Sequence, residues 1–286
     1  MEYDIFTRES KLLWGKKDPV NVETTEKCDT TMRTNHCTAI KNNKMYVFFG
    51  KNRFLLDSIL SFDFENIKWE EMKTIGEKLE RKIGMECVYV TKSDSIYIFG
   101  GLDGNGFSSN EMIQISLKNF ESKIICKANL NDQDYGVHFH SMVYDGDDSI
   151  YIYGGKNEKG ETNNFLKFEI SKNQFFLIEN KKNSPPPPSC FSHLFFINSN
   201  IILIDGKNLS TVYFFDFHSS SWEHKKTDLS CFAVETHLSK KFFSVDHDPL
   251  NQCFYLVGGN LVDEIDDFTI CIFFFFFFTF FYIFQH

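Results

Sequence analysis

Two groups of side chains have the residue types of a metal site. His138 and His140 alternate along a run that reads as a strand, so we expect both side chains on one face, where together with a carboxylate they could hold a metal. Asp246, His247 and Asp248 are three consecutive potential ligands. However, His140 takes a position of the repeat unit at which His36 and His193 also stand, which makes it a repeat residue. The second group falls where a polar turn is expected. We therefore predict structural roles for both groups and no metal site.

No other catalytic motif is evident. The sequence has no Ser-His-Asp elbow, P-loop or G-x-G-x-x-G fingerprint. Its eight cysteines form no C-x-x-C pair, which argues against a zinc ribbon or a redox motif. The first residues lack the pattern of a secretory signal, so we expect reduced thiols and a cytoplasmic protein. No cofactor is predicted.

Composition favours a β-rich fold. The chain has 286 residues, 42% of them hydrophobic, which is enough for one large domain or two ordinary ones. Its apolar residues are mainly aromatic and β-branched, with 34 Phe, and these types favour strands. The net charge of -9 argues against nucleic acid as a partner, because phosphate binding requires clustered Lys and Arg.

A short apolar run ending in two glycines recurs along the chain. Residues 95–101 read S-I-Y-I-F-G-G and residues 149–155 read S-I-Y-I-Y-G-G, with further copies at 44–51, 200–206 and 252–259. Aligning the first residue of each doublet gives spacings of 50, 54, 51 and 53 for these positions: Gly50, Gly100, Gly154, Asp205 and Gly258. A near-constant period of about 50 residues predicts five repeat units.

The pattern of apolar runs within each unit predicts four strands. A first apolar run, a polar hairpin turn and the doublet run are followed by a polar loop and two more runs. The doublet run is almost wholly apolar, so we predict that it is the inner strand, with its glycines at a sharp backbone turn. Trp69 and Trp222 lie on the fourth run, six residues after Asp63 and Asp216. We expect these Trp side chains to pack between units.

The glycine doublet and the acidic residue six positions before a Trp resemble the kelch repeat, over about residues 36–272. The resemblance implies an all-β fold, a kelch-type β-propeller with about five recognisable four-stranded blades, or six in an intact gene product. It also implies that a strand near residues 11–16, within an N-terminal segment 1–35, closes the last blade. The expected blades span these ranges: 36–75, 84–127, 138–181, 191–226 and 242–272.

Two other segments call for an interpretation. Residues 185–188 are four prolines, which predict a stiff, exposed polyproline linker. The Phe-rich end, including the tail 273–286, has three competing interpretations: a membrane anchor near the minimum spanning length, the closing strands of the fifth blade, or a translated T-rich non-coding stretch. We favour the third, because an exposed run of Phe would aggregate. A membrane partner is expected only if the anchor is genuine.

The kelch resemblance implies a non-catalytic protein–protein interaction scaffold, such as a substrate-recognition or cytoskeleton-associated adaptor. The alternative is a propeller enzyme acting on a sugar or small metabolite, of the oxidase or epimerase type. The Cys, Tyr and His residues of a copper-radical oxidase do not occur at matching positions. We expect a protein partner on the loops that follow the doublets. The candidate contact residues are Phe54, Leu55, Leu56, Leu102, Asp103, Phe107, Asn157, Glu158 and Asn208.

Overall fold

The computed structural model describes residues 2–4, 9–11, 33–181, 185–208, 211–226, 241–248, 250, 253–260 and 270–274. The chain divides into two compact units, Met1–Met32 and Arg33–His286. The described residues form strands and turns without a helix, which confirms the all-β prediction for this part of the chain. Among them there is accordingly no apolar helix of membrane-spanning length.

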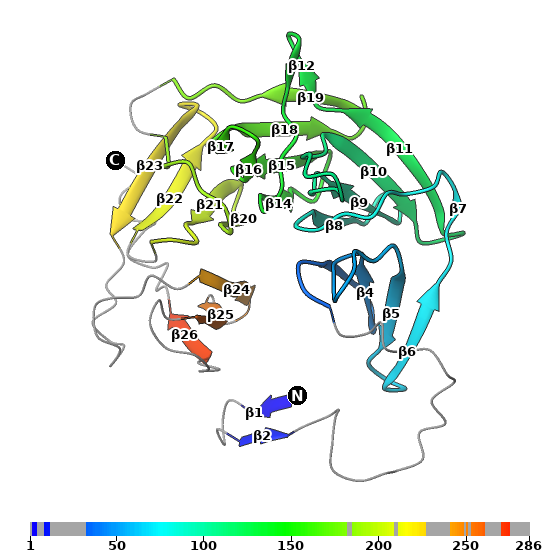
Figure 1. Ribbon diagram of the computed structural model, residues 1–286. Coiled ribbons are helices and arrows are strands. Elements are labelled where there is room, and N and C mark those ends of the chain that lie inside the picture. Colours follow the sequence, from blue (N-terminus) through cyan, green and yellow to red (C-terminus); the bar gives the residue numbers. More distant parts are fainter. Residues whose placement is uncertain are drawn as a thin grey trace. The chain divides into compact units, whose positions relative to one another are not determined.

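Four sheets, each built on four antiparallel strands in chain order, make up most of the second unit (Figure 1). The first sheet contains β3 (Cys37–Lys41), β4 (Lys44–Phe48), β5 (Ile59–Asp63) and β6 (Lys68–Met72). The second contains β8 (Glu86–Val90), β9 (Ser95–Phe99), β10 (Glu111–Ser116) and β11 (Glu121–Lys127), with β7 (Ile75–Gly76) parallel to β11. The third contains β14 (Ser141–Tyr144), β15 (Ser149–Tyr153), β18 (Phe165–Glu169) and β19 (Gln174–Leu177). The fourth contains β20 (His193–Ile197), β21 (Asn200–Ile204), β22 (Thr211–Asp216) and β23 (Ser221–Lys226).

Shorter sheets complete the described structure. Three strands form a further sheet: β24 (Lys241–Asp248), β25 (Cys253–Asn260) and β26 (Ile270–Phe274). Two small hairpins lie in connections, β12 (Asn129–Leu130) with β13 (Gln133–Asp134) and β16 (Lys156–Asn157) with β17 (Gly160–Glu161). In the first unit β1 (Glu2–Asp4) pairs with β2 (Glu9–Lys11). Residues 12–16 and 275–286, which hold most of the predicted closing strand and of the Phe-rich tail, lie outside the described residues.

The doublet strand is the second strand of its sheet, as the order of the runs predicted, and it is an interior strand. The strands β4, β9, β15 and β21 are each hydrogen-bonded on both sides. The first strands β3, β8, β14 and β20 instead lie beside one another from sheet to sheet. All five residues of β9 are buried. The residues of β9 are mostly apolar because a sheet packs on each face of the strand. Their composition therefore does not tell where the strand lies in the order of its sheet.

The register of the first doublet also differs from the prediction. Phe48, Phe99 and Tyr153 are equivalent, because each pairs with the first residue of the preceding strand. The doublet of the first sheet is therefore Phe49–Gly50, with φ angles of 55° and 90° that match 72° and 98° in the second sheet. Phe49 adopts the left-handed conformation while its side chain is buried. The sequence alignment placed Gly50 one position too early in the repeat.

A chain of backbone hydrogen bonds links the starts of the four first strands. Gly84 N donates to Asn35 O at 3.0 Å, Phe139 N donates to Gly84 O at 2.6 Å, and Phe191 N donates to Phe139 O at 3.0 Å. All four residues have positive φ and precede the first strand by two positions. The repeated conformation satisfies backbone groups that would otherwise be unpaired where neighbouring sheets approach each other.

The apolar core consists of clusters between successive sheets. In the third sheet Ile150, Phe168 and Phe175 form a register row that is buried against the second sheet. In the fourth sheet the equivalent Trp222 packs on Tyr153 and Phe165 of the third sheet, with ring centroids 5.6 and 5.2 Å apart, as predicted. The equivalent row of the first sheet is Ile40, Met45, Phe62 and Trp69, and there Ile40 is 59% exposed.

The proline run is only partly the exposed linker that we predicted. Pro186 is buried, and its carbonyl accepts hydrogen bonds from Tyr153 Oη at 2.9 Å and Asn163 Nδ2 at 3.3 Å. Pro185, Pro187 and Pro188 are exposed. The Pro187 carbonyl also accepts a hydrogen bond from Tyr153 Oη, at 3.2 Å, so two carbonyls of the run anchor it to the third sheet.

Candidate partner-binding loop face

The loops that follow the second strands contact one another in sequence. We call residues 51–57, 78–81, 102–110, 156–164 and 207–208 the loop face. A Cβ built on Gly104 would lie 3.4 Å from Leu55 Cδ1, which joins the loops of the first and second sheets. Ser108 N donates to Glu158 Oε1 at 2.7 Å, and Lys207 forms an ion pair with Glu161. Four neighbouring sheets thus contribute to one continuous surface.

Each long loop begins at the same structural anchor. The residue after the doublet pairs with a residue that precedes the first strand of its own sheet. Lys51 N donates to Thr34 O at 2.9 Å, Leu102 N to Ile83 O at 2.8 Å, and Lys156 N to His138 O at 2.8 Å. Because the base of each loop is fixed in this way, the residues at its tip are held at a defined place above the sheet.

Two loop tips hold a phenylalanine in solvent. Phe54 is 76% exposed, and its backbone N donates to Asn52 Oδ1 at 3.0 Å. Phe107 is 64% exposed, and its backbone N donates to Asp103 Oδ1 at 2.8 Å. Burial tends to raise the pKa of Asp103, but the backbone donors at Phe107 and Asn105 outweigh it, and the pKa lies below its ordinary value. A polar side chain in each loop therefore fixes the backbone that presents the ring.

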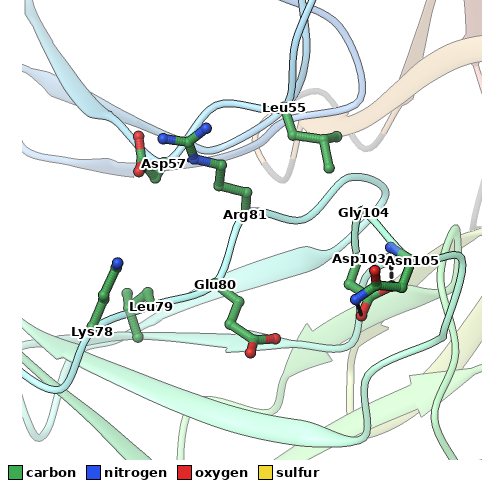
Figure 2. A pocket seen from close by; sticks show the side chains of 9 residues that line it. All are labelled: Leu55, Asp57, Lys78, Leu79, Glu80, Arg81, Asp103, Gly104 and Asn105. Atoms are coloured by element: carbon green, nitrogen blue, oxygen red, sulfur yellow. Dashed lines mark hydrogen bonds and ion pairs between the residues drawn. The ribbon is translucent and has the colours of Figure 1, made fainter.

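A groove of about 510 Å³ lies between the loops of the first and second sheets. Some of the residues that line it are contact residues predicted from the sequence, and others are not. They are Leu55, Asp57, Lys78, Leu79, Glu80, Arg81, Asp103, Gly104 and Asn105. Arg81 Nε lies 3.0 Å from Asp57 Oδ2. Figure 2 shows this ion pair on one side of the groove and Asp103 with Asn105 on the other. The lining of the groove combines two apolar residues, Leu55 and the buried Leu79, with charged side chains.

The candidate contact residues are distributed over this surface. Leu55 and Asp103 line the groove. Leu56 is half-buried and its N donates to Gly50 O at 2.9 Å, while the half-buried Leu102 pairs with Ile83. Asn157 lies in β16, and Glu158 and Asn208 are exposed. The sequence did not point to residues 78–81 or to Asp57, because only the fold brings the connection between sheets beside the first loop.

The two histidines do not form the pair expected from the sequence. Phe139 lies between them with a φ of 55°, and β14 starts only at Ser141, so the prediction of a shared strand face is wrong. His138 Nδ1 lies 3.0 Å from Ser108 Oγ, and burial lowers its pKa. His140 is buried against Phe99, without a hydrogen-bond partner at either ring nitrogen among the described residues, and burial lowers its pKa to about 3. The surroundings of both histidines indicate structural roles.

The acidic triplet in the fifth unit is not a turn. Residues 246–248 lie within β24, so the predicted polar turn is wrong at this point. The His247 ring lies 4.8 Å from the Phe254 ring, and burial lowers its pKa. Within the described ranges, no three His, Cys, Asp or Glu side chains come close enough together to hold a metal ion.

The repeat geometry agrees with a comparison of the sequence with protein families. Residues 35–259 match the family model described as the KLHDC2/KLHL20/DRC7 Kelch-repeats domain. The chain belongs to the kelch-repeat family. A comparison with curated proteins gave no match.

The four-stranded sheets are thus blades of a kelch-type β-propeller, and the loop face is formed by kelch loops. Kelch-repeat domains generally bind other proteins and are generally not catalytic. The kelch motif accounts for the glycine doublet, for the acidic residue six positions before a Trp and for the Trp itself, and the roles of all three are structural. In this kelch-repeat chain the variable residues of the loops are left as the candidates for recognition.

Proposed function

We propose that this kelch-repeat chain is a non-catalytic scaffold whose loop face binds a partner protein, as in a substrate-recognition adaptor of the cytosol. The observation that carries the proposal is the presence of two exposed phenylalanines, Phe54 and Phe107, on the two loops that line the groove. Free thiols at Cys37, Cys87, Cys126 and Cys190 are compatible with a reducing compartment.

The exposed rings favour binding for an energetic reason. Burying a Phe side chain is worth about 1.5–3 kcal/mol, so a ring held in water at a structured loop tip forgoes that stabilisation in the free protein. A partner that covers both rings recovers it in the complex. Aromatic side chains next to a groove are typical of residues that dominate the energy of protein interfaces.

Site-specific photo-crosslinking tests the proposal. Benzoylphenylalanine replaces Phe54 or Phe107, and the matched control is Phe64, which is 44% exposed in the turn at the opposite end of β5. We expect a discrete adduct from positions 54 and 107 but not from 64. Excess wild-type protein should suppress this adduct, whereas excess protein with both Phe54→Ala and Phe107→Ala should not. Equal adducts from all three positions would contradict the proposal.

A further inference from the structure

Most carboxylates of the loop face have a partner within the face. Two form ion pairs and two accept backbone hydrogen bonds. These contacts are Asp57 with Arg81, Glu161 with Lys207, Asp103 with the amides of Asn105 and Phe107, and Glu158 with the amide of Ser108. Within the described part of the face, Glu80 is the one carboxylate without such a contact. The negative charges are thus largely used to build the loops.

The basic side chains of the same face behave differently. Five of the seven are exposed and form no ion pair with any described residue: Lys51, Arg53, Lys78, Lys156 and Lys159. The loop face therefore retains an excess of unpaired positive charge, although the chain as a whole carries a net charge of -9.

The opposite ends of the sheets provide the contrast. In the turns there and at the strand ends beside them, four lysines form ion pairs: Lys41 with Asp94, Lys44 with Asp63, Lys92 with Asp147 and Lys172 with Glu169. Lys118, in the turn between β10 and β11, is exposed and has no ion pair among the described residues. Between the two ends of the sheets, unpaired cations thus lie mainly on the loop face, although exposed lysines without an ion pair also occur on outer strands and connections, at Lys73, Lys123, Lys181 and Lys226 of the described residues.

We propose that the loop face binds an acidic segment of its partner protein, with apolar side chains of that segment against Phe54 and Phe107 and carboxylates near the unpaired cations. The inference rests on the proposed function and specifies the partner's chemistry. Opposite charges steer the approach and fix the register, while the acidic remainder of the chain repels the same segment elsewhere. Glu80, Glu158 and Asp103 interrupt the positive charge, which disfavours a continuous phosphate backbone.

Fluorescence anisotropy with three probes tests the inference. The probes are a short labelled peptide of alternating Glu and Phe, the same peptide with Gln in place of Glu, and a labelled oligothymidylate. We expect the Glu peptide to bind roughly tenfold more tightly than the Gln peptide, with an affinity that falls as NaCl is raised. The combined substitution of Lys51→Glu and Arg53→Glu should weaken Glu-peptide binding by roughly tenfold or more, and the matched control Lys118→Glu should not change it.

Several results would overturn the inference. These are no binding of the Glu peptide, equal binding of the Gln peptide, equally tight binding of the oligothymidylate, or the same loss in the Lys118→Glu control. If the Gln peptide binds equally and Phe54→Ala still weakens it, the charge inference fails while the proposed protein-binding function stands. If photo-crosslinks at positions 54 and 107 are absent as well, the proposed function itself fails.

Discussion

The backbone amide of Gly101 donates a hydrogen bond to the carbonyl of Val137, 2.8 Å away, and so ties the second sheet to the third. The second residue of the doublet does the same in two other sheets. Gly50 N donates to Lys82 O at 3.3 Å, and Gly155 N donates to Ser189 O at 2.8 Å. The doublet therefore connects neighbouring sheets as well as turning the chain.

Gly100→Ala should destabilise the protein far more than Gly106→Ala. Both residues have positive φ, which costs an L-residue roughly 1–2 kcal/mol. A Cβ on Gly100 would also lie 2.3 Å from Val137 O and 2.8 Å from His140 Cε1, whereas nothing lies within 4 Å at Gly106. We expect an additional loss of about 2 kcal/mol or more at Gly100, measured by urea unfolding. Equal losses of unfolding free energy at the two positions would show that the neighbouring sheet shifts to accommodate a methyl group at position 100 without a cost in stability.

Phe49→Gly should destabilise the first sheet even though it restores the glycine of the repeat. Glycine removes roughly 1–2 kcal/mol of left-handed backbone strain. The buried ring, however, contributes about 3–5 kcal/mol through its packing. The larger effect wins, so equilibrium unfolding should show a net loss of about 2 kcal/mol. A stabilised variant would mean that the strain outweighs the packing of Phe49.

Phe168→Ala should cost more than Phe62→Ala at the equivalent register position. Phe168 is fully buried between sheets, so its truncation should cost about 3–5 kcal/mol. Phe62 is half-buried and packs on Trp69 of its own sheet at 4.9 Å. We expect about half the loss there, measured by denaturant titration of both variants. A loss at Phe62 equal to that at Phe168 would show that another element covers this face in solution.

His140→Phe should make stability less dependent on pH on the acidic side. Burial lowers the pKa of His140 from its ordinary 6.5 to about 3. Between these values the unfolded chain binds a proton that the folded protein does not, so acidification destabilises the fold by at most about 1.4 kcal/mol per pH unit. The neutral stability should hardly change, because the variant removes two unpaired buried nitrogens. Unfolding titrations from pH 7 to pH 5 with the same slope in both proteins would argue against this assignment.

The sequence predicts the elements of this fold better than their arrangement. Period, turn chemistry and the Asp216-to-Trp222 spacing predict the four-stranded units and the packing of Trp222 between them. The first doublet was misaligned because Phe49 adopts the conformation that usually identifies glycine. The groove was missed because Arg81 reaches Asp57 across 24 residues of chain. Such pairings depend on how sheets stack, which a local pattern does not encode.

Whether the loop face binds the partner is tested by the affinity of the crosslinked partner for three single variants. Phe54→Asp and Phe107→Asp place a charge at the proposed contact, and Phe64→Asp places one at the opposite end of β5. Isothermal titration calorimetry should show a loss of at least about 2 kcal/mol in binding for the first two and none for the third. Unchanged affinity in the first two variants, with a loss in Phe64→Asp, would contradict binding by the loop face.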